Sequence, residues 1–321
     1  MKIAVLGGGR SSEHDVSLRS AEAVARGLAD AGHEVLRVTI SRQGAWSCDG
    51  EALELAPGEG LLGADAAFPA LHGPFGEDGS VQGLLEWLDI PYVGSDVLSS
   101  AVCMDKLTLK RIIAQAGIPQ VAFVDAAEPG WRERCKEMGL PLWVKPSRLG
   151  SSVGISRVED LDELESAVEQ ARRHDPRVIV EAHASGREVE CSLLGNVDVE
   201  TSLPGEVVAH GDWYDYETKY SAGGMDLVVP APIGDEANAR VRELAARAFE
   251  LGGCAGLARC DFFVIDDGNV LVNEINTMPG FTETSVYARL WEASGLDYPS
   301  LCDRLVQLSL ERHERSRSFE F

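Results

Sequence analysis

The sequence predicts an α/β protein that begins with a doubly wound parallel-sheet domain and continues into a two-part region of mixed strands and helices. In residues 1–95, short apolar runs alternate with segments of helical spacing, which is the order of βαβ units. Around Gly94–Ser100 the composition shifts and a second unit begins. A chain of 321 residues is long enough for two or three domains, and we expect them at 1–95, 96–181 and 182–321.

Composition excludes several classes of protein. A net charge of −23 argues against surfaces for nucleic acid or anionic membranes, which need basic patches. The seven cysteines contain no CxxC pair, so neither a disulfide framework nor a zinc site is indicated and reduced thiols are expected. The N-terminus lacks a signal-peptide pattern, and no apolar run reaches the ~20 residues of a membrane span. We therefore expect a cytoplasmic protein.

The first βαβ unit places a glycine turn at the end of its first strand. Lys2–Leu6 is the strand, Ser17–Ala29 has helical spacing, and Glu34–Ile40 is the next strand. A dinucleotide-binding turn is disfavoured because Ser12 stands where GxGxxG needs its third glycine. Glu13, at the start of the helix, either caps it or pairs with the ammonium group of a substrate.

A second loop of the N-terminal domain has the composition of a functional segment. The strand Ala66–Leu71 is followed by His72–Ser80, which holds three glycines, a proline, a histidine and two acids in nine residues. A plain turn needs far less, so we expect this loop to line a site. The helix Val81–Leu88 and a short strand, Ile90–Val93, complete the domain.

The second unit carries lysines suited to phosphate. Lys106 lies near the start of a helix running from Met104 to Ala116, and Lys145 ends an apolar strand. The loop Ser147–Ile155 follows directly, and its glycines and serines could cover phosphates. The alternatives are a solvated helix lysine for Lys106 and a flexible hairpin tip for the loop. It is not a Walker motif, which requires GxxxxGK[ST] before a helix.

Residues 212–224 form a polar connection with three tyrosines and a tryptophan, which is typical of a lid that excludes water from a site. Before it, Val178–Glu181 is a strand that ends in an acid. Such an acid either caps the strand or holds a ribose hydroxyl or an adenine amino group.

A β-hairpin near the C-terminus presents charged groups on one face. Its strands are Ala258–Ile265 and Val270–Asn276, joined by a turn that contains Asp267-Gly268. A tight turn places Ile265 opposite Val270, Asp261 opposite Glu274 and Arg259 opposite Asn276, with Phe262, Val264, Leu271 and Ile275 on the core face. Opposed carboxylates repel unless a cation lies between them, and oxygen ligands favour Mg²⁺. An ordinary surface hairpin is the alternative.

Eight motifs, in this order, resemble the D-alanine–D-alanine ligase family of the ATP-grasp superfamily over nearly the whole chain. They are GGGRSSEHDVSLRSA, ALHGPFGEDGSVQG, MDKLTLK, WVKPSRLGSSVGIS, GREVECSLLGN, YDYETKY, GLARCDFF and NEINTMPGFTETS. The resemblance implies an N-terminal domain followed by a two-part ATP-grasp fold. It also implies that ATP phosphorylates one D-alanine, whose acyl phosphate is attacked by the amine of a second, and it implies a homodimer.

The resemblance also implies a role for individual residues. ATP would be held by Lys106, Lys145, Ser151, Ser152, Glu181, Ala182, His183, Ala184, Glu188, Lys219 and Glu274. Two Mg²⁺ ions, or Mn²⁺, would be held by Asp261, Glu274 and Asn276. Substrates would contact Glu13, His72 oriented by Glu77, Arg259, Ser285 and Val286, and catalysis would use Glu13, Ser151, Tyr220, Arg259, Gly280 and Ser285.

Two other functions stay open at this point. A ligase of the same mechanism for other D-amino acids is one, although the presence of Tyr220 favours D-alanine over a hydroxy acid as second substrate. A non-catalytic nucleotide-binding protein is the other, and it predicts the loss of Arg259, Asp261 or Glu274, all of which are present.

Overall fold

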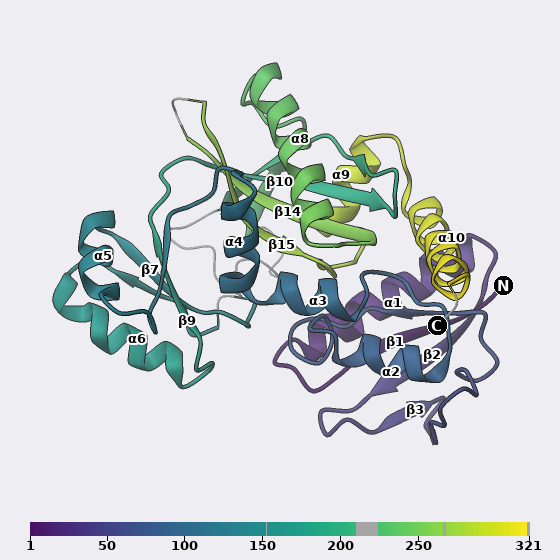
Figure 1. Ribbon diagram of the computed structural model, residues 1–321. Coiled ribbons are helices and arrows are strands. Elements are labelled where there is room, and N and C mark those ends of the chain that lie inside the picture. The colour runs from purple at the N-terminus through teal and green to yellow at the C-terminus, as the bar shows by residue number, and fades with distance from the viewer. Residues whose placement is uncertain (152, 210–223, 266–267, 320–321) are drawn as a thin grey trace.

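The computed structural model describes residues 1–151, 153–209, 224–265 and 268–319, and these form three sheets with helices around them (Figure 1). The helices are α1 (His14–Asp30), α2 (Ser80–Leu88), α3 (Val97–Met104), α4 (Lys106–Gln115), α5 (Trp131–Met138), α6 (Leu164–Arg172, after a 3-10 turn at Leu161–Glu163), α8 (Asp235–Leu251), α9 (Val286–Ala293) and α10 (Tyr298–Arg317).

The N-terminal sheet has the strand order β4-β3-β2-β1-β5, and its parallel part confirms the doubly wound prediction. Its strands are β1 (Lys2–Gly8), β2 (Glu34–Ile40), β3 (Trp46–Cys48), β4 (Glu51–Ala52) and β5 (Ala66–Pro69). Helices α1 and α10 cover one face and α2 covers the other, each with its own apolar cluster. The antiparallel strands β3 and β4, which were not predicted, extend the edge beyond β2.

Two glycines let the first strand and helix approach closely. A Cβ on Gly7 would lie 2.6 Å from the Cβ of Ala21, and one on Gly8 would lie 2.3 Å from the Ile40 carbonyl oxygen. Gly8 also has a φ of +95°, which side chains rarely adopt. The glycine turn therefore serves strand–helix packing, and it brings the start of α1 to the carboxyl end of the sheet.

The central sheet has the order β6-β9-β7-β8, and all of its pairs are antiparallel. Its strands are β6 (Phe123–Asp125), β7 (Leu142–Pro146), β8 (Ser156–Val158) and β9 (Val178–Ala182). Helices α5 and α6 cover its apolar face, while Lys145 and Glu181 point from the other face. The lysine and the acid that the sequence singled out thus share one side of this sheet.

The third sheet has six strands in the order β13-β12-β10-β14-β15, with β11 paired to β10. Its strands are β10 (Arg187–Gly195), β11 (Glu200–Thr201), β12 (Gly205–Ala209), β13 (Met225–Val228), β14 (Gly256–Val264) and β15 (Val270–Asn276). Helix α8 packs on the apolar face together with side chains from α3 and α4. The opposite face of β14 and β15 is left for the polar groups of the hairpin.

The predicted hairpin register is right at its inner end and wrong at its outer end. Asp261 lies opposite Glu274 and Arg259 opposite Asn276, as predicted. A register shift beyond Asp261 then leaves Asn273 as an extra residue, so that Val264 and not Ile265 pairs with Val270. The same shift puts Val270 and Val272 in the core and leaves the predicted core residue Leu271 half-buried on the other face.

Two other predicted elements differ from the structure. Ile90–Val93 is not a strand: it forms a single parallel bridge, between Tyr92 and Ala67, because Pro91 lacks an N–H and Gly94 turns the chain away at a φ of +103°. The helix predicted from Met104 to Ala116 is α4, which begins at Lys106 because Asp105 has extended backbone angles and caps it through the Thr108 N–H. Met104 instead ends α3, a helix that was not predicted.

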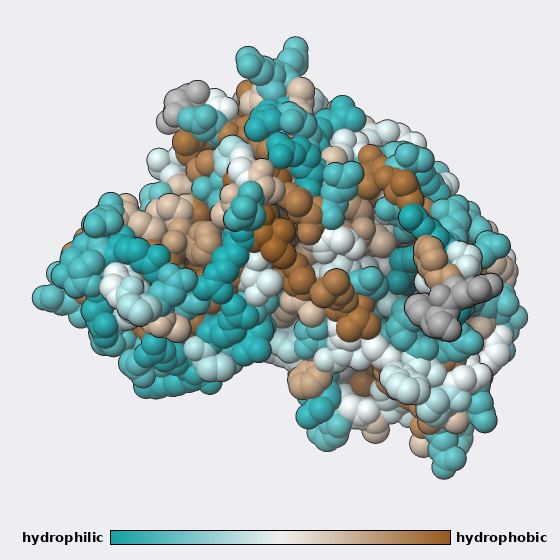
Figure 2. All heavy atoms as spheres, viewed as in Figure 1, coloured by the Kyte–Doolittle hydropathy of each residue, from teal (hydrophilic) through white to brown (hydrophobic). Residues whose placement is uncertain are grey.

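The visible surface is mostly hydrophilic, with one hydrophobic band. Figure 2 shows hydrophilic residues over most of the visible face and a band of hydrophobic residues near its middle, over the region of α3 in Figure 1. Val97 and Leu98 of α3 are among the exposed apolar side chains, Leu98 at 72%. Within the described ranges, no helix is both long enough and apolar enough to span a membrane.

Candidate active site

A cavity of about 560 Å³ lies where the N-terminal domain, the central loop and the hairpin meet. It gathers predicted site residues that are far apart in the sequence: Glu13, His72, Glu77, Lys106, Ser151, Arg259, Glu274, Asn276, Gly280, Ser285 and Val286. Both polar and apolar groups line it, as expected of a site for a small polar ligand. Lys145, Glu181 and Asp261 lie outside this lining.

Glu13 reaches the cavity from the first residue before α1. Its side chain makes no capping hydrogen bond, so the capping alternative is not what the structure shows. Instead the buried carboxylate accepts a hydrogen bond from the Ser151 hydroxyl of the central loop. Gly73 leaves the room for it, since a Cβ there would lie 2.4 Å from Glu13 Oε2. A carboxylate in this position can pair with a ligand ammonium group.

His72 is oriented by remote groups and not by Glu77, which corrects the prediction. Its Nε2 lies 2.8 Å from the Ser20 hydroxyl, and its Nδ1 lies 3.0 Å from the Met278 carbonyl oxygen. Burial lowers the pKa of the imidazole, which favours a neutral ring. Glu77 accepts a hydrogen bond from the Gly73 N–H at 2.7 Å instead, and burial and the nearby Glu13 raise its pKa to about 8.

Arg259 is fixed between two carboxylates on the polar face of the third sheet. Its Nε lies 2.8 Å from Glu190 Oε2, and its guanidinium makes two 2.7 Å hydrogen bonds to Asp261. The Asn276 amide donates to the same Asp261 carboxylate at 3.1 Å. Burial alone would lower the pKa of Arg259, but Asp261 and Glu190 raise it well above its ordinary value. The result is a permanently charged, pre-oriented cation at the cavity wall.

Lys106 connects the hairpin to the central loop. Its ammonium group lies 3.5 Å from Glu274 Oε2 and donates a 2.8 Å hydrogen bond to the Leu149 carbonyl oxygen. Its backbone N–H donates to the Ser147 carbonyl oxygen at 3.0 Å. The lysine is thus not a solvated helix residue. It places a positive charge where the loop meets the proposed metal ligands.

A buried cluster of charges lies behind the cavity. Glu181 is 2% exposed, and its two oxygens lie 2.9 Å from Lys110 Nζ and 2.5 Å from Lys145 Nζ. Burial would raise the pKa of the Glu181 carboxyl, but the two lysines lower it to about 2. The predicted ATP residues Lys145 and Glu181 therefore pair with each other. Lys110 is a second amino group on the same carboxylate, and burial lowers its pKa while Glu181 opposes this shift.

The turn after β15 closes the cavity on the side of α9. The Ser285 hydroxyl accepts a hydrogen bond from the Thr282 N–H at 3.0 Å and lies 2.8 Å from the Thr282 hydroxyl. A Cβ on Gly280 would lie 3.4 Å from this hydroxyl, so the glycine keeps the turn open beside it. Val286 is buried at the start of α9.

The remaining predicted residues are divided between the end of β9 and segments that the structure leaves out. Ala182 ends β9, and the His183 ring accepts a 3.3 Å hydrogen bond from the Trp143 indole, while Ala184 follows in the connection and Glu188 is exposed on β10. Ser152, Lys219, Tyr220 and most of the predicted lid lie outside the described residues.

Sequence reasoning missed two charged residues of the site. The alternating run Arg187–Leu194 predicts that Glu190 is exposed on a strand, yet this residue is 6% exposed and pairs with Arg259. Lys110 follows Lys106 by four residues, so the two share one face of α4. That spacing could have identified Lys110 as a site residue from the sequence. Glu190 could not be identified in this way, because its partner Arg259 is distant in the sequence.

Family models match most of the chain. The model for the D-ala D-ala ligase C-terminus matches residues 112–307, and the model for the D-ala D-ala ligase N-terminus matches residues 2–60 and 54–95. Together they cover the N-terminal sheet, the central sheet and the hairpin.

Individual relatives match at nearly full length. The D-alanine–D-alanine ligase of Deinococcus radiodurans is 48% identical over 97% of this chain and 98% of its own. Among solved structures, the D-alanine–D-alanine ligase of Coxiella burnetii has a TM-score of 0.91 at 36% identity, covering 99% of this chain and 96% of its own. The VanG D-Ala:D-Ser ligase of Enterococcus faecalis has a TM-score of 0.86 at 34% identity, and the match covers 96% of this chain and 99% of the VanG chain.

Proposed function

Since the chain belongs to the D-alanine–D-alanine ligase family, with its ATP-grasp fold, we propose how its own residues join two D-alanines to D-alanyl-D-alanine. The enzyme is an ATP-dependent ligase, and its dipeptide product serves peptidoglycan synthesis. The observation that carries the assignment of roles is that Glu13, Arg259 and Glu274 converge on one cavity from three distant parts of the chain.

The reaction has two steps, the first at the γ-phosphorus of ATP and the second at the carboxyl carbon of the first D-alanine. A carboxylate oxygen of the first D-alanine attacks the γ-phosphorus of ATP, and ADP leaves. The amine of the second D-alanine then attacks the acyl carbon, a tetrahedral oxyanion forms, and phosphate leaves as the amide is made. Negative charge develops first on the phosphoryl group and then on the oxyanion, so fixed cations and N–H donors are needed at both.

The first D-alanine would lie between Glu13 and Arg259. The Glu13 carboxylate would pair with its ammonium group, with the neutral His72 ring beside it. Arg259, held by Glu190 and Asp261, would face the developing oxyanion together with the Gly280 N–H. Because these groups are already oriented, little reorganisation is required during the reaction.

ATP would lie between the central sheet and the hairpin. Lys106 and Lys145 would hold its phosphates, and Ser151 and Ser152 belong to the loop that covers them. Glu181, the backbone of Ala182, His183 and Ala184, and Glu188 would hold adenine and ribose, with Lys219 as a further phosphate contact. The ion pair between Lys145 and Glu181 would have to open or share its charges when the nucleotide binds.

The hairpin has the donor set that Mg²⁺ or Mn²⁺ requires. Asp261, Glu274 and Asn276 provide only oxygen ligands and lie on the same face of two paired strands. Lys106 pairs with the Glu274 carboxylate and Arg259 pairs with the Asp261 carboxylate, so each of these two acids already has a cation beside it. Two bound metal ions would neutralise the phosphate oxygens of ATP. Asp261 would exchange part of its bonding to Arg259 and Asn276 for a metal ion.

The second D-alanine would enter beside α9. Ser285 would bind its carboxylate, Val286 would contact its methyl group, and Tyr220 of the lid would close the site.

We further propose that the chain is divided into domains at 1–95, 96–181 and 182–321, that it is located in the cytoplasm, and that it forms a homodimer. Light scattering after size exclusion tests the homodimer.

The decisive experiment measures ADP release with ATP and Mg²⁺ in the presence of D-alanine, L-alanine, D-serine or D-lactate, with the product identified by mass. We expect D-alanine to give rapid release and the mass of D-alanyl-D-alanine. Products that contain D-serine instead would assign the chain to a D-Ala:D-Ser type of ligase. No release with any of them would refute the proposed reaction.

A further inference from the structure

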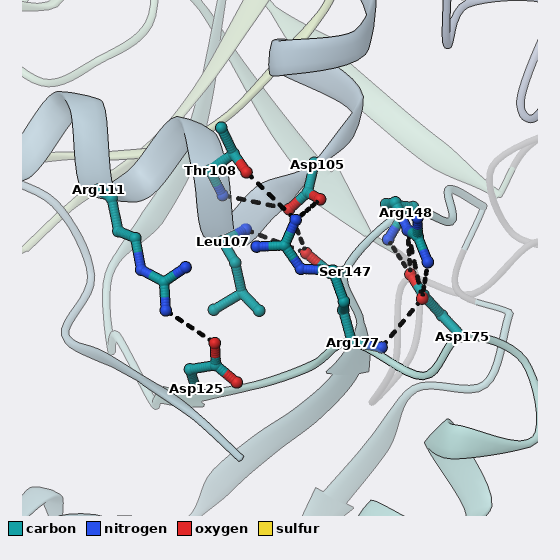
Figure 3. Close-up of polar contacts among 9 residues, drawn as sticks. All are labelled: Asp105, Leu107, Thr108, Arg111, Asp125, Ser147, Arg148, Asp175 and Arg177. Carbon is teal, nitrogen blue, oxygen red and sulfur yellow. Dashed lines mark hydrogen bonds and ion pairs between the residues drawn. The ribbon is translucent and has the colours of Figure 1, made fainter. Parts of the chain in front are cut away.

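A network of charged residues lies just outside the cavity and is not used by the proposed mechanism (Figure 3). It joins the start of α4, the end of β7 and the turn between α6 and β9. Asp105, Ser147 and Asp175 are its buried members, at 6%, 0% and 3% exposure. Buried carboxylates require partners, so each contact in the network has a physical reason to persist.

Asp175 holds the beginning of the segment 148–154, which we call the phosphate loop because it is the part of the loop Ser147–Ile155 proposed to cover the phosphates of ATP. The Arg148 backbone N–H donates to its Oδ2 at 2.8 Å, and the Arg148 guanidinium donates to both carboxylate oxygens, with the shortest distance 2.6 Å. Burial would raise the pKa of Asp175, but these hydrogen bonds lower it, and the hydrogen bond also raises the pKa of Arg148. The first residue of the loop is therefore fixed through both its backbone and its side chain.

The same turn holds the end of the loop. Gly154 has a φ of +72°, and a Cβ there would lie 2.7 Å from His174 Cδ2 and 3.0 Å from Pro146. Close packing on His174, next to Asp175, thus fixes the second end of the loop. Both ends of the segment 148–154 rest on one turn of two residues.

This turn is also connected to the helix that carries Lys106. Asp175 accepts a hydrogen bond from the Arg177 backbone N–H at 3.0 Å, and the Arg177 guanidinium pairs with Asp105. Asp105 caps α4 and accepts a 2.8 Å hydrogen bond from the Ser147 hydroxyl, which itself accepts from the Leu107 N–H at 3.0 Å. One continuous network therefore fixes the start of α4 and both ends of the loop.

We propose that Asp105, Asp175 and Arg177 are positioning residues that hold the phosphate loop and Lys106 in register for ATP. The inference rests on the proposed role of the loop 148–154 in covering the phosphates. None of the three lines the cavity, so they act through Arg148, Gly154 and Lys106. Disturbing the network should weaken nucleotide binding more than D-alanine binding, because the loop reaches the D-alanine site through the contact of Ser151 with Glu13, whereas Arg259, Ser285 and Val286 lie on other segments.

The test compares two substitutions with a matched control. Asp175→Asn keeps the size of the side chain but weakens its hold on the Arg148 guanidinium, and Asp105→Asn keeps a good helix cap while losing the charge that pairs with Arg177. Asp125→Asn is the control. Asp125 ends β6 and pairs at 2.7 Å with Arg111, which is on the same helix α4 as Lys106 but lies away from the loop. Thermal unfolding of each variant reports its stability.

We expect both network variants to raise the KM for ATP about tenfold, since charge-assisted hydrogen bonds are among the stronger ones. The KM for D-alanine should rise by less than the KM for ATP, because the loop contacts the D-alanine site through Ser151 and Glu13, and the control should change neither constant by more than about twofold. Unchanged KM values for ATP in both variants would overturn the proposal, and so would equal increases for ATP and D-alanine. If Asp175→Asn fails to fold, Asp105→Asn decides the question.

A second readout separates this proposal from the reaction itself. Calorimetric binding of ADP with Mg²⁺ needs no turnover, so it reports on the loop even if D-alanine proves to be the wrong substrate. Weaker ADP binding in Asp105→Asn and Asp175→Asn, with normal binding in Asp125→Asn, supports the positioning role. Equal binding in all three would refute it.

Discussion

The Ser151 hydroxyl donates a hydrogen bond to the Glu13 carboxylate and so joins two segments that are 138 positions apart. One belongs to the phosphate loop and the other to the start of α1. Gly73 and Gly150 stand beside the carboxylate, and a Cβ on either would lie within 3.6 Å of Glu13 Oε2. The side of the cavity proposed for the nucleotide and the side proposed for the substrate are thus in direct contact through two side chains.

Removing this contact should weaken binding of the first D-alanine. In Ser151→Ala the Glu13 carboxylate loses a hydrogen-bond donor that orients it, and we expect the KM for D-alanine at the first site to rise about tenfold. Steady-state kinetics with D-alanine varied measures the effect. Ser166→Ala is the control, because this exposed serine of α6 donates its hydroxyl to the Glu163 carbonyl oxygen of the preceding 3-10 turn. Equal kinetics in the two variants would contradict the role given to Ser151.

Glu274→Gln should abolish turnover. A neutral amide at the proposed shared metal ligand weakens both ions, and the loss should exceed the ~10–100-fold typical of groups that only support a metal ligand. ADP release at increasing Mg²⁺ or Mn²⁺ measures it. The control is Glu243→Gln, which alters an exposed ion pair with Arg240 on α8. Activity near that of the wild type at saturating Mg²⁺ would rule out the metal assignment.

The sequence predicted this hairpin only in part, for a physical reason. Side-chain alternation places Arg259, Asp261, Glu274 and Asn276 on one face, and the structure confirms their pairing. The extra residue Asn273 breaks the alternation beyond that point, and a bulge of this kind leaves no distinct pattern in the residues around it. The error therefore falls at the outer end of the hairpin and spares the site.

Partners from remote segments were the other limit of prediction. The family resemblance implies that Glu77 orients His72, yet Ser20 of α1 and the Met278 carbonyl hold the ring. Glu190 of β10 likewise pairs with a residue distant in the sequence, Arg259 of the neighbouring strand β14. Sequence motifs identify which residues belong to the site, whereas the contacts among them depend on how distant segments pack.

Glu181→Gln should strongly destabilise the fold. It leaves the ammonium groups of Lys110 and Lys145 buried near each other without a compensating carboxylate, and breaking such a pair costs about 3–5 kcal/mol. Urea unfolding at pH 7 measures the change. The carboxylate has a pKa lowered to about 2, so its contribution is present at pH 7 and is lost only as the pH falls from about 4.5 through 2.

The control for Glu181 is Glu165→Gln. Glu165 pairs with Arg132, and both side chains are about half exposed, so the loss should be at most about 1 kcal/mol. A Glu181 variant that is no less stable than this control would show that the three buried charges do not depend on one another.

Glu77→Gln should change how stability varies with pH. Burial and the charge of Glu13 raise the pKa of Glu77 to about 8, from an ordinary value of 4.5. Below pH 4.5 both the folded and unfolded states hold the proton, so the group does not make stability vary with pH. Between pH 4.5 and 8 the unfolded state alone releases it, and the wild type should lose stability as the pH rises, with no further loss above 8. The glutamine variant lacks this titration, so its advantage over the wild type should be smallest near pH 4.5 and largest at pH 8 and above.

Thermal unfolding across this range measures the difference, with Glu59→Gln on an exposed loop as the control. A gap between wild type and Glu77→Gln that stays constant from pH 4.5 to 9 would mean that Glu77 is ionised throughout, and the proton held beside Glu13 would then not exist.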